Sequence, residues 1–258
     1  MIDILVVLVE FLMRLSFGTA FSMACTSGRQ VTSGFFRVHL WMLLGFATLT
    51  TLIAYSYPAP FSRPNWLLAA AIALMVLSYV LSVAWLYERR TLGGAGLWLM
   101  AAIALAGAAL AWPLSATALA ALLQLADVAT SGLLLGATLT AMLLGHWYLN
   151  TPTMQLAPLR RLLALIFIAT ALRASVSVCG LLLTLQFAEP LTTSTWLFLA
   201  LRYIAGIAGV ALFTYLARQT LKIPNTQSAT GILYAAVILA FIGELTSQLL
   251  SASAPFPL

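Results

Sequence analysis

Long apolar segments alternate with short polar connectors along the whole sequence. Crossing the ~30 Å hydrocarbon core of a membrane as a helix takes about 20 apolar residues, and each segment here has that length. Glycine, proline, asparagine and serine fill the connectors, as is typical of turns. We therefore expect an all-α fold, a polytopic membrane protein with eight transmembrane helices. The expected spans cover residues 4–25, 35–57, 65–87, 94–112, 122–148, 159–187, 195–217 and 229–251.

The composition excludes the soluble classes of protein. Hydrophobic residues make up 63% of the 258 residues and charged residues 7%, with a mean hydropathy of +1.05. A soluble domain carries about 25% charged residues, so a cytosolic enzyme, a disordered regulator and a disulfide-built secreted module are all excluded. We expect one integral membrane domain over residues 1–258, a multi-pass protein of the inner membrane in contact with the lipid bilayer.

The connector bases decide between eight spans and seven, because the Ala- and Gly-rich fourth segment is the weakest. With eight spans, only Arg63 lies at one face and all the other connector bases lie at the opposite face. With seven spans, the same nine residues split four against five. An excess of Lys and Arg marks the cytoplasmic side, so we expect eight spans and two extracytoplasmic termini. This topology also accounts for the net charge of +6, and no nucleic-acid partner is implied. The bases of the richer face are Arg29, Arg37, Arg89, Arg90, Arg160, Arg161, Arg218 and Lys222.

A weak internal repeat divides the sequence into two halves. Trp66-Leu67 opens the third span and Trp196-Leu197 opens the seventh, and an Arg-x-Thr-Leu motif follows each of these spans. Residues 1–112 and 113–258 would then form two four-helix bundles of the same orientation, a 4+4 pseudo-repeat. Ordinary interfacial Trp and Arg residues explain the same pattern, and both interpretations stay open.

Six ionisable residues lie inside the spans, three acidic and three basic. Each costs ~2.5 to 3.5 kcal/mol at the centre of a membrane helix unless it is paired or solvated. Their positions along the spans put all six between the membrane centre and the extracytoplasmic side, so one charge-balanced cluster is expected. Such a cluster serves as a proton relay in a polar cavity, as a structural ion-pair network, or as a contact with a partner subunit. The six are Glu10, Arg14, Asp127, Arg173, Arg202 and Glu244.

Both histidines are expected at the cytoplasmic side, in the second and fifth spans. His39 precedes Trp41 by two residues, and His146 is followed by Trp147 and Tyr148. Two facing imidazoles are the axial metal ligands of a haem b, and an imidazole with aromatic neighbours suits a quinone head group. The sequence therefore predicts cofactor-binding roles for these five residues, with metal ligation by the histidines only if haem is present. Ordinary interfacial residues are the alternative interpretation.

Two small-xxx-small patterns predict close helix packing. Gly132 and Gly136 form one in the fifth span, and Ala205 and Gly209 form the other in the seventh. In lipid such pairs let helix backbones approach closely. The first lies between Asp127 and His146, which makes the fifth span the expected centre of the bundle.

Three functions are consistent with these features. The leading expectation is a subunit of a respiratory or other electron-transfer complex that binds quinone or haem b near the cytoplasmic face. Because the connectors are too short to hold a redox domain, this role requires other redox subunits as partners. The alternatives are a secondary transporter or exporter that uses Glu10, Asp127 and Glu244, and a non-catalytic scaffold subunit of a membrane assembly. No nucleotide-binding, metalloprotease or hydrolase motif has a supporting context, so no catalytic residue is assigned.

Overall fold

The computed structural model describes residues 4–113, 115, 117–151, 154–187, 191–223 and 225–258. Within these residues the protein is all-α, with eight helices long and apolar enough to span a membrane and no strand. The prediction of eight spans is confirmed, and the helix ends lie within a few residues of those expected. The predicted connector residues Pro152, Glu189, Pro190 and Pro224 lie outside the described residues. The first six spans are α1 (Ile4–Ala24), α2 (Ser33–Ser56), α3 (Pro64–Leu86), α4 (Arg90–Ala111), α5 (Ala118–Asn150) and α6 (Ala157–Phe187). The seventh comprises α7 (Thr193–Leu201), η1 (Arg202–Gly209) and α8 (Val210–Thr220), and the eighth is α9 (Thr226–Ser251).

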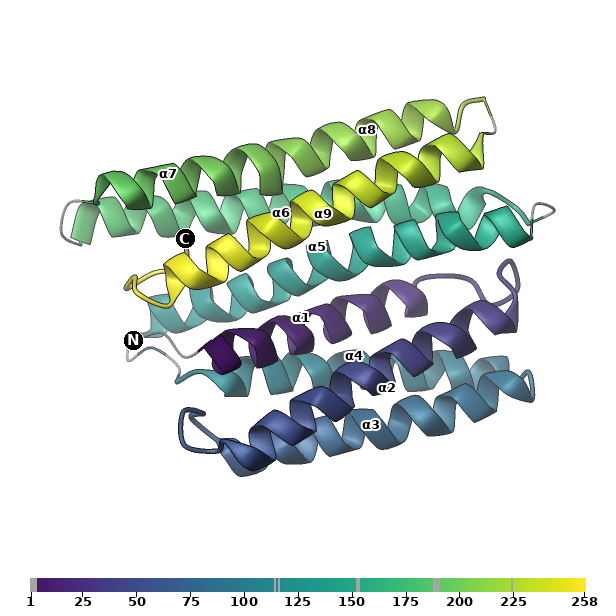
Figure 1. The fold of residues 1–258 in the computed structure, drawn as a ribbon, viewed down its shortest axis with the longest axis horizontal. Helices are drawn as coiled ribbons and strands as arrows, with labels where there is room; N and C mark the ends of the chain where they lie inside the picture. Colours follow the sequence, from purple (N-terminus) through teal and green to yellow (C-terminus); the bar gives the residue numbers. More distant parts are fainter. Residues whose placement is uncertain (1–3, 114, 116, 152–153, 188–190, 224) are drawn as a thin grey trace.

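Helices α1 and α5 lie side by side at the centre of the molecule (Figure 1). Helix α1 also packs against α2 and α4, and α3 closes this group by contacting both of them. Helix α5 packs against α6 and α9, and the seventh span packs on those two. The α1–α5 interface therefore joins the first four spans to the last four.

The two ends of the bundle differ in charge. One end, which we call the basic face, carries Arg29 and Arg89 in its connectors, Arg90 at the start of α4, and Arg160 and Arg161 in the first turns of α6. Side-chain hydrogen bonds tie these connectors together: Gln30 donates to Gln155 over 3.1 Å, Trp147 donates to Thr32 over 2.9 Å, and Arg160 donates to the carbonyl of Leu221 over 3.1 Å. The opposite end, which we call the tail face, carries the start of α1 and residues 252–258.

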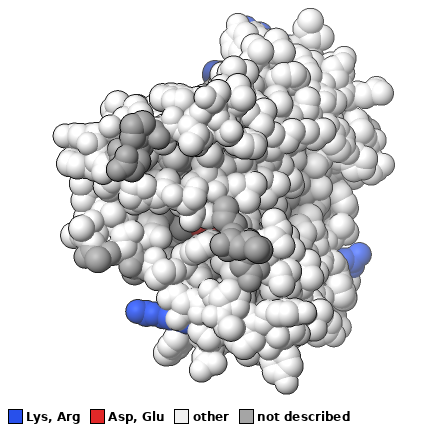
Figure 2. Space-filling view, turned by 60° about the vertical axis from the view of Figure 1, so that its left-hand side comes forward, with Lys and Arg blue, Asp and Glu red and all other residues white. Residues whose placement is uncertain are grey.

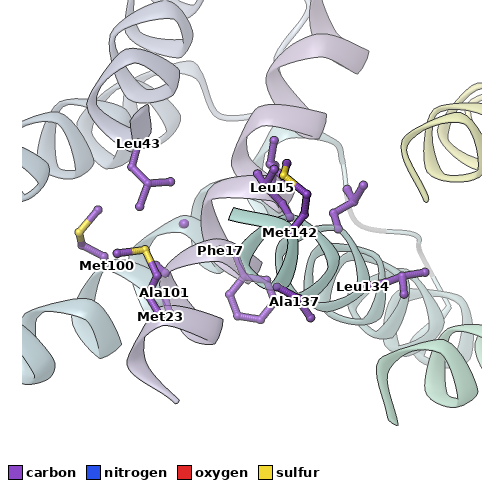
Figure 3. Packing of buried hydrophobic residues seen from close by; sticks show 14 of the residues in the cluster. Leu15, Phe17, Met23, Leu43, Met100, Ala101, Leu134, Ala137 and Met142 are labelled. Carbon is purple, nitrogen blue, oxygen red and sulfur yellow. The ribbon is translucent and has the colours of Figure 1, made fainter. Parts of the chain in front are cut away.

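Helix α1 is the most enclosed span. Of its most apolar window 78% is buried, whereas no other span exceeds 50%. Its side chains Leu15, Phe17 and Met23 meet residues of α2, α4 and α5, among them Leu43, Met100 and Met142 (Figure 3). The outer helices instead expose large apolar side chains such as Leu52, Ile204 and Leu197, as expected of surfaces that face lipid.

Glycine makes the close crossing of α1 and α5 possible. A Cβ atom added at Gly136 would lie 1.8 Å from the carbonyl carbon of Gly18, and one added at Gly18 would lie 1.7 Å from the carbonyl oxygen of Gly132. The two backbones are therefore in direct contact. This is the role that the Gly132-xxx-Gly136 pattern predicts, with the glycine of α1 as its counterpart.

The seventh span contains a π-helical segment that the sequence did not predict. Segment η1 runs from Arg202 to Gly209 between two α-helices. Within it Gly206 meets Gly243 of α9, where an added Cβ would lie 2.6 Å from the Cα atom. Segments of π-helix are uncommon and are often found at functional sites, and this one begins at a buried arginine.

We expect Gly136→Ala to destabilise the protein, because its methyl group must push α1 and α5 apart. The loss should exceed about 2 kcal/mol, the range of substitutions that overpack a core. The measurement is the unfolding midpoint of the purified protein in detergent. Gly45→Ala is the matched control, since nothing lies within 4 Å of that position, and it should leave stability unchanged or raise it by up to about 1 kcal/mol. Equal effects of the two substitutions would contradict the proposed role of the crossing.

Candidate functional site

The six ionisable residues that the sequence predicts for the membrane interior meet in one buried group. Ion pairs link them in an alternating order of acid and base, from α1 through α5 and α6 to α9 and η1. None of the six is more than 5% exposed. We call this group the ion-pair network; in order, its members are Glu10, Arg14, Asp127, Arg173, Glu244 and Arg202.

Arg173 is the centre of the network. Its Nε atom donates to both carboxylate oxygens of Glu244, over 2.9 and 3.0 Å, and its Nη1 atom donates to Asp127. Its Nη2 atom donates to Ser247 over 2.9 Å. All three nitrogens of this fully buried guanidinium are thus satisfied, by α5 on one side and by α9 on the other.

Asp127 connects the two halves of the molecule. One of its carboxylate oxygens accepts a hydrogen bond from Arg173, and the other accepts one from Arg14 Nη1 over 2.7 Å. Arg14 in turn pairs with Glu10, one turn earlier in α1, and its Nε atom donates to that carboxylate over 3.1 Å. One carboxylate on α5 therefore forms ion pairs with two guanidiniums that come from different helices.

The two ends of the network have different surroundings. At the acidic end, the second oxygen of Glu10 accepts a hydrogen bond of 2.6 Å from the indole nitrogen of Trp112. At the basic end, Arg202 donates to Ser177 over 3.2 Å, to the carbonyl of Gly243 over 3.2 Å, and to Glu244 over 3.4 Å. Its Nη2 atom is buried and has no hydrogen-bond partner among the described residues.

A cavity of about 120 Å³ leads from the tail face to the acidic end of the network. Glu10, Arg14 and Asp127 line its inner part, and residues 254–257 line its outer part. Figure 2, in which the side bearing the tail face is turned forward, shows a largely uncharged surface with an acidic side chain visible in a central hollow. We call this space the tail cavity.

Gln248 adds an unsatisfied polar group to the tail cavity. This residue of α9 is 4% exposed, and neither its amide nitrogen nor its amide oxygen has a partner among the described residues. A buried amide normally forms hydrogen bonds, and orphaned polar atoms beside a cavity indicate water or a bound polar ligand. The cavity is large enough to hold several water molecules in contact with two carboxylates.

Further buried hydroxyl groups lie between the network and the basic face. Thr19 and Ser22 of α1, and Thr140 of α5, are fully buried, and their oxygens have no partner among the described residues. Ser22 and Thr140 each lie one turn beyond the Gly18–Gly136 contact, toward the basic face. The α1–α5 interface thus stays polar past its closest approach.

The residues predicted to bind a cofactor lie in separate surroundings. His39 is buried between Phe35 and Trp147, and its Nδ1 atom is 2.6 Å from the carbonyl oxygen of Phe35. His146 is exposed, with its Nδ1 atom 3.4 Å from the hydroxyl of Tyr234. No contact recorded among the described residues joins the two imidazoles.

Of the three predicted aromatic residues, Trp147 lies against His39, whereas Trp41 and Tyr148 face other neighbours. Trp41 is 51% exposed and packs against Tyr79 on the side of α2 away from His39. Trp147 contacts Thr32 and the ring of His39, while the buried Tyr148 donates its hydroxyl hydrogen to the carbonyl of Gln155. None of these residues lines the tail cavity.

Sequence reasoning missed four residues that complete the site: Trp112, Ser177, Ser247 and Gln248. Two of them carried a signal, because Ser247 and Gln248 follow Glu244 by three and four residues and so share its helix face. Trp112 and Ser177 carried none, since an interfacial tryptophan and a serine in a span are ordinary features.

No family model, no curated protein and no solved structure matches this chain. The chemical capacity of the site follows from its own residues. Its three carboxylates accept protons, its three guanidiniums stay charged, and its acidic end contacts a cavity. Within the described residues no group of three metal-ligating side chains is present.

We expect Asp127→Asn to be strongly destabilising, because two buried guanidiniums lose a shared counter-charge. Breaking a buried ion pair from one side costs about 3–5 kcal/mol, which should appear as a lower unfolding midpoint in detergent. Glu88→Gln is the control: Glu88 pairs with Arg90 over 3.6 Å at an exposed site, where the loss should stay within about 1 kcal/mol. Adding Arg14→Gln to Asp127→Asn should recover part of the loss, and a further loss would contradict the charge-balance argument.

Proposed function

We propose that this protein carries out proton-coupled transport across the membrane, with the ion-pair network as its proton-handling site. The tail cavity carries the proposal, because it brings a water-sized space to Glu10 and Asp127 inside a span region that is otherwise apolar. Intramembrane ionisable residues that face a cavity are typical of proton and substrate pathways.

The charge balance of the network favours a proton over a metal cation. Three carboxylates face three guanidiniums, so a metal ion would find no net negative charge to hold it. A proton needs only one carboxylate, provided that the arginine paired with it can pair with a second carboxylate instead. Arg14 contacts two carboxylates, Glu10 and Asp127, so protonation of Glu10 leaves this arginine paired with Asp127.

Because acids and bases alternate along the network, the same exchange of carboxylate partners can continue further into the molecule. Arg173 contacts both Asp127 and Glu244, and Arg202 contacts Glu244. Each protonation step is therefore accompanied by a change of partner for one guanidinium. The hydroxyls of Thr19, Ser22 and Thr140, which have no partner in the described part of the chain, supply hydrogen-bonding groups on the way to the basic face.

The π-helical segment supplies a place where the seventh span departs from a regular helix. It begins at Arg202, the basic end of the network, and its backbone meets α9 at Gly206. Interrupted helices beside a buried charge are a recurrent feature of transporter sites. This observation favours transport over a purely structural network.

The electron-transfer role receives less support from the geometry. It rests on His39, whose Nδ1 contact with the carbonyl of Phe35 leaves Nε2 for a ligand. Of the other four residues of that hypothesis, Trp147 contacts the ring of His39. Trp41, His146 and Tyr148 have other neighbours, so a haem or quinone held by all five residues would require these three to rearrange. The transport proposal requires no such rearrangement, because the residues of the ion-pair network already contact one another.

The proposal includes the orientation of the protein in the membrane. We infer that the basic face is cytoplasmic and that both termini are extracytoplasmic, because lysine and arginine accumulate on the cytoplasmic side. The two groups of four spans would then be parallel repeats, with their first helices α1 and α5 in contact. Protons would enter the tail cavity from outside.

Glu10→Gln should reduce proton flux at least tenfold, because it removes the carboxylate nearest to the tail cavity. The assay uses the purified full chain in liposomes that contain a pH-sensitive dye, with a potential imposed by potassium and valinomycin. Glu88→Gln, which removes an exposed carboxylate, should leave the flux unchanged. Gln248→Leu should also lower the flux, since it replaces the amide in the cavity wall with an apolar group of similar size and leaves all six charges in place.

Two results would overturn the transport proposal. One is a wild-type flux no higher than that of empty liposomes. The other is a b-type haem in the reduced-minus-oxidised spectrum of the purified protein, lost in both His39→Ala and His146→Ala, which would establish the electron-transfer role instead.

The orientation is tested with two cysteine positions and a membrane-impermeant maleimide. In a Cys179→Ser background, the exposed Cys25 at the basic face should react only after the inner membrane is permeabilised. In a background without native cysteines, Ser62→Cys in the connector between α2 and α3 should react in intact spheroplasts, because that connector lies at the tail face. The opposite pattern would reverse the proposed direction of entry.

A further inference from the structure

A second cavity, of about 280 Å³, lies at the basic face and plays no part in the ion-pair network. The connector after α1, the end of α3 and the first turns of α4 enclose it. We call it the indole cavity, after Trp85 in its wall. Its lining consists of Met23, Ala24, Thr26, Ser27, Gly28, Arg29, Phe36, Trp85, Arg90, Thr91, Gly94 and Leu97.

The lining divides into a basic polar rim and an apolar floor. Arg29 and Arg90, both exposed, form the rim together with Ser27 and Thr91. The third hydroxyl residue of the lining, Thr26, is buried and donates to the carbonyl of Ser22. Met23 and Leu97, both fully buried, belong to the floor. One exposed acid lies near the rim: Glu88 is 3.6 Å from Arg90 and does not line the cavity.

Trp85 presents a buried and unused hydrogen-bond donor at this site. The side chain is 2% exposed, and its Nε1 atom has no partner among the described residues. The indole stacks on Phe36 with ring centroids 4.0 Å apart and planes 6° apart. A Cβ atom added at Gly93 would lie 2.6 Å from both Nε1 and Cε2, so the five-membered ring of the indole packs against the first turn of α4.

The first turn of α4 adds positive electrostatic potential at the same place. The first backbone N–H groups of a helix lack intrahelical partners and, with the helix dipole, favour anions. The N-cap residue Arg89 supplies no side-chain hydrogen bond to them. Two guanidiniums and a helix N-terminus therefore border one cavity, and the indole of Trp85 lines it beside them.

We propose that the indole cavity binds the phosphate group of an anionic phospholipid. The donors identify the ligand as a phosphate-bearing anion, because arginine and helix N-termini recognise phosphate. The apolar floor identifies the source of the phosphate as a lipid. The glycerol and first acyl carbons of a lipid would pack against Met23 and Leu97, whereas a soluble anion has no apolar group to place there. Basic pockets between spans on the cytoplasmic side are known to hold acidic head groups.

The test measures lipid binding to the delipidated full chain in neutral detergent by native mass spectrometry. The probes are dioleoyl-phosphatidylglycerol and dioleoyl-phosphatidylcholine. We expect the anionic lipid to bind at least tenfold more tightly, and Arg29→Gln with Arg90→Gln to reduce its affinity to that of the zwitterionic lipid. Trp85→Phe keeps the stacking on Phe36 and removes the N–H donor, so it should weaken binding about tenfold.

Arg218→Gln is the matched control, because Arg218 is exposed near the same face and lies outside the cavity lining. Its affinity for the anionic lipid should stay within twofold of the wild type. An equal loss in this variant, or no preference between the two lipids, would overturn the site. Displacement of phosphatidylglycerol by millimolar inorganic phosphate would overturn the lipid assignment in favour of a soluble phosphate. None of these outcomes depends on proton flux, so this proposal and the transport proposal fail independently.

Discussion

The arrangement of this protein depends on the neutralisation of six charges where no bulk water is available. Hydrocarbon does not solvate a carboxylate or a guanidinium, so each charge must find an opposite charge on another helix or within its own. Asp127 and Arg173 meet this requirement with contacts that cross between helices: Asp127 binds arginines of α1 and α6, and Arg173 binds carboxylates of α5 and α9. Four of the eight spans are thereby fixed relative to one another by a single group of side chains.

Close packing at the α1–α5 crossing makes that arrangement sterically possible. Because Gly18 and Gly136 let the two backbones touch, the Nη1 atom of Arg14 can donate to a carboxylate oxygen of Asp127 over 2.7 Å. The same interface leaves a cavity on the tail side and, on the basic side, hydroxyls that have no partner among the described residues. A network that served only stability would gain from filling those spaces with apolar side chains, which is why the unfilled polar groups favour a role in proton movement.

The two proposed sites use opposite features of one bundle. In the tail cavity, two acids, an arginine and an amide line a smaller space that opens at the tail face, beside a network of balanced charge. In the indole cavity, two arginines and three hydroxyl residues line a larger space with an apolar floor. The first suits water and protons, and the second suits the head group of a lipid that holds the protein at the basic face. Transport and lipid binding thus occupy different ends of the molecule and place separate demands on the sequence.

The sequence by itself determined the number of spans, their ends to within a few residues, and the identity of all six buried charges, because hydropathy and the cost of an isolated charge in lipid are local properties of a segment. It also identified Gly132 and Gly136 as a packing surface. Only the tertiary structure decided which acid pairs with which base and that Trp112 and Gln248 belong to the site. It also decided that the two predicted histidines face different neighbours and that the seventh span contains a π-helical segment. These features depend on which helix faces lie together, and helix rotation in a membrane is set by contacts between distant segments that leave no periodic signal in any one of them.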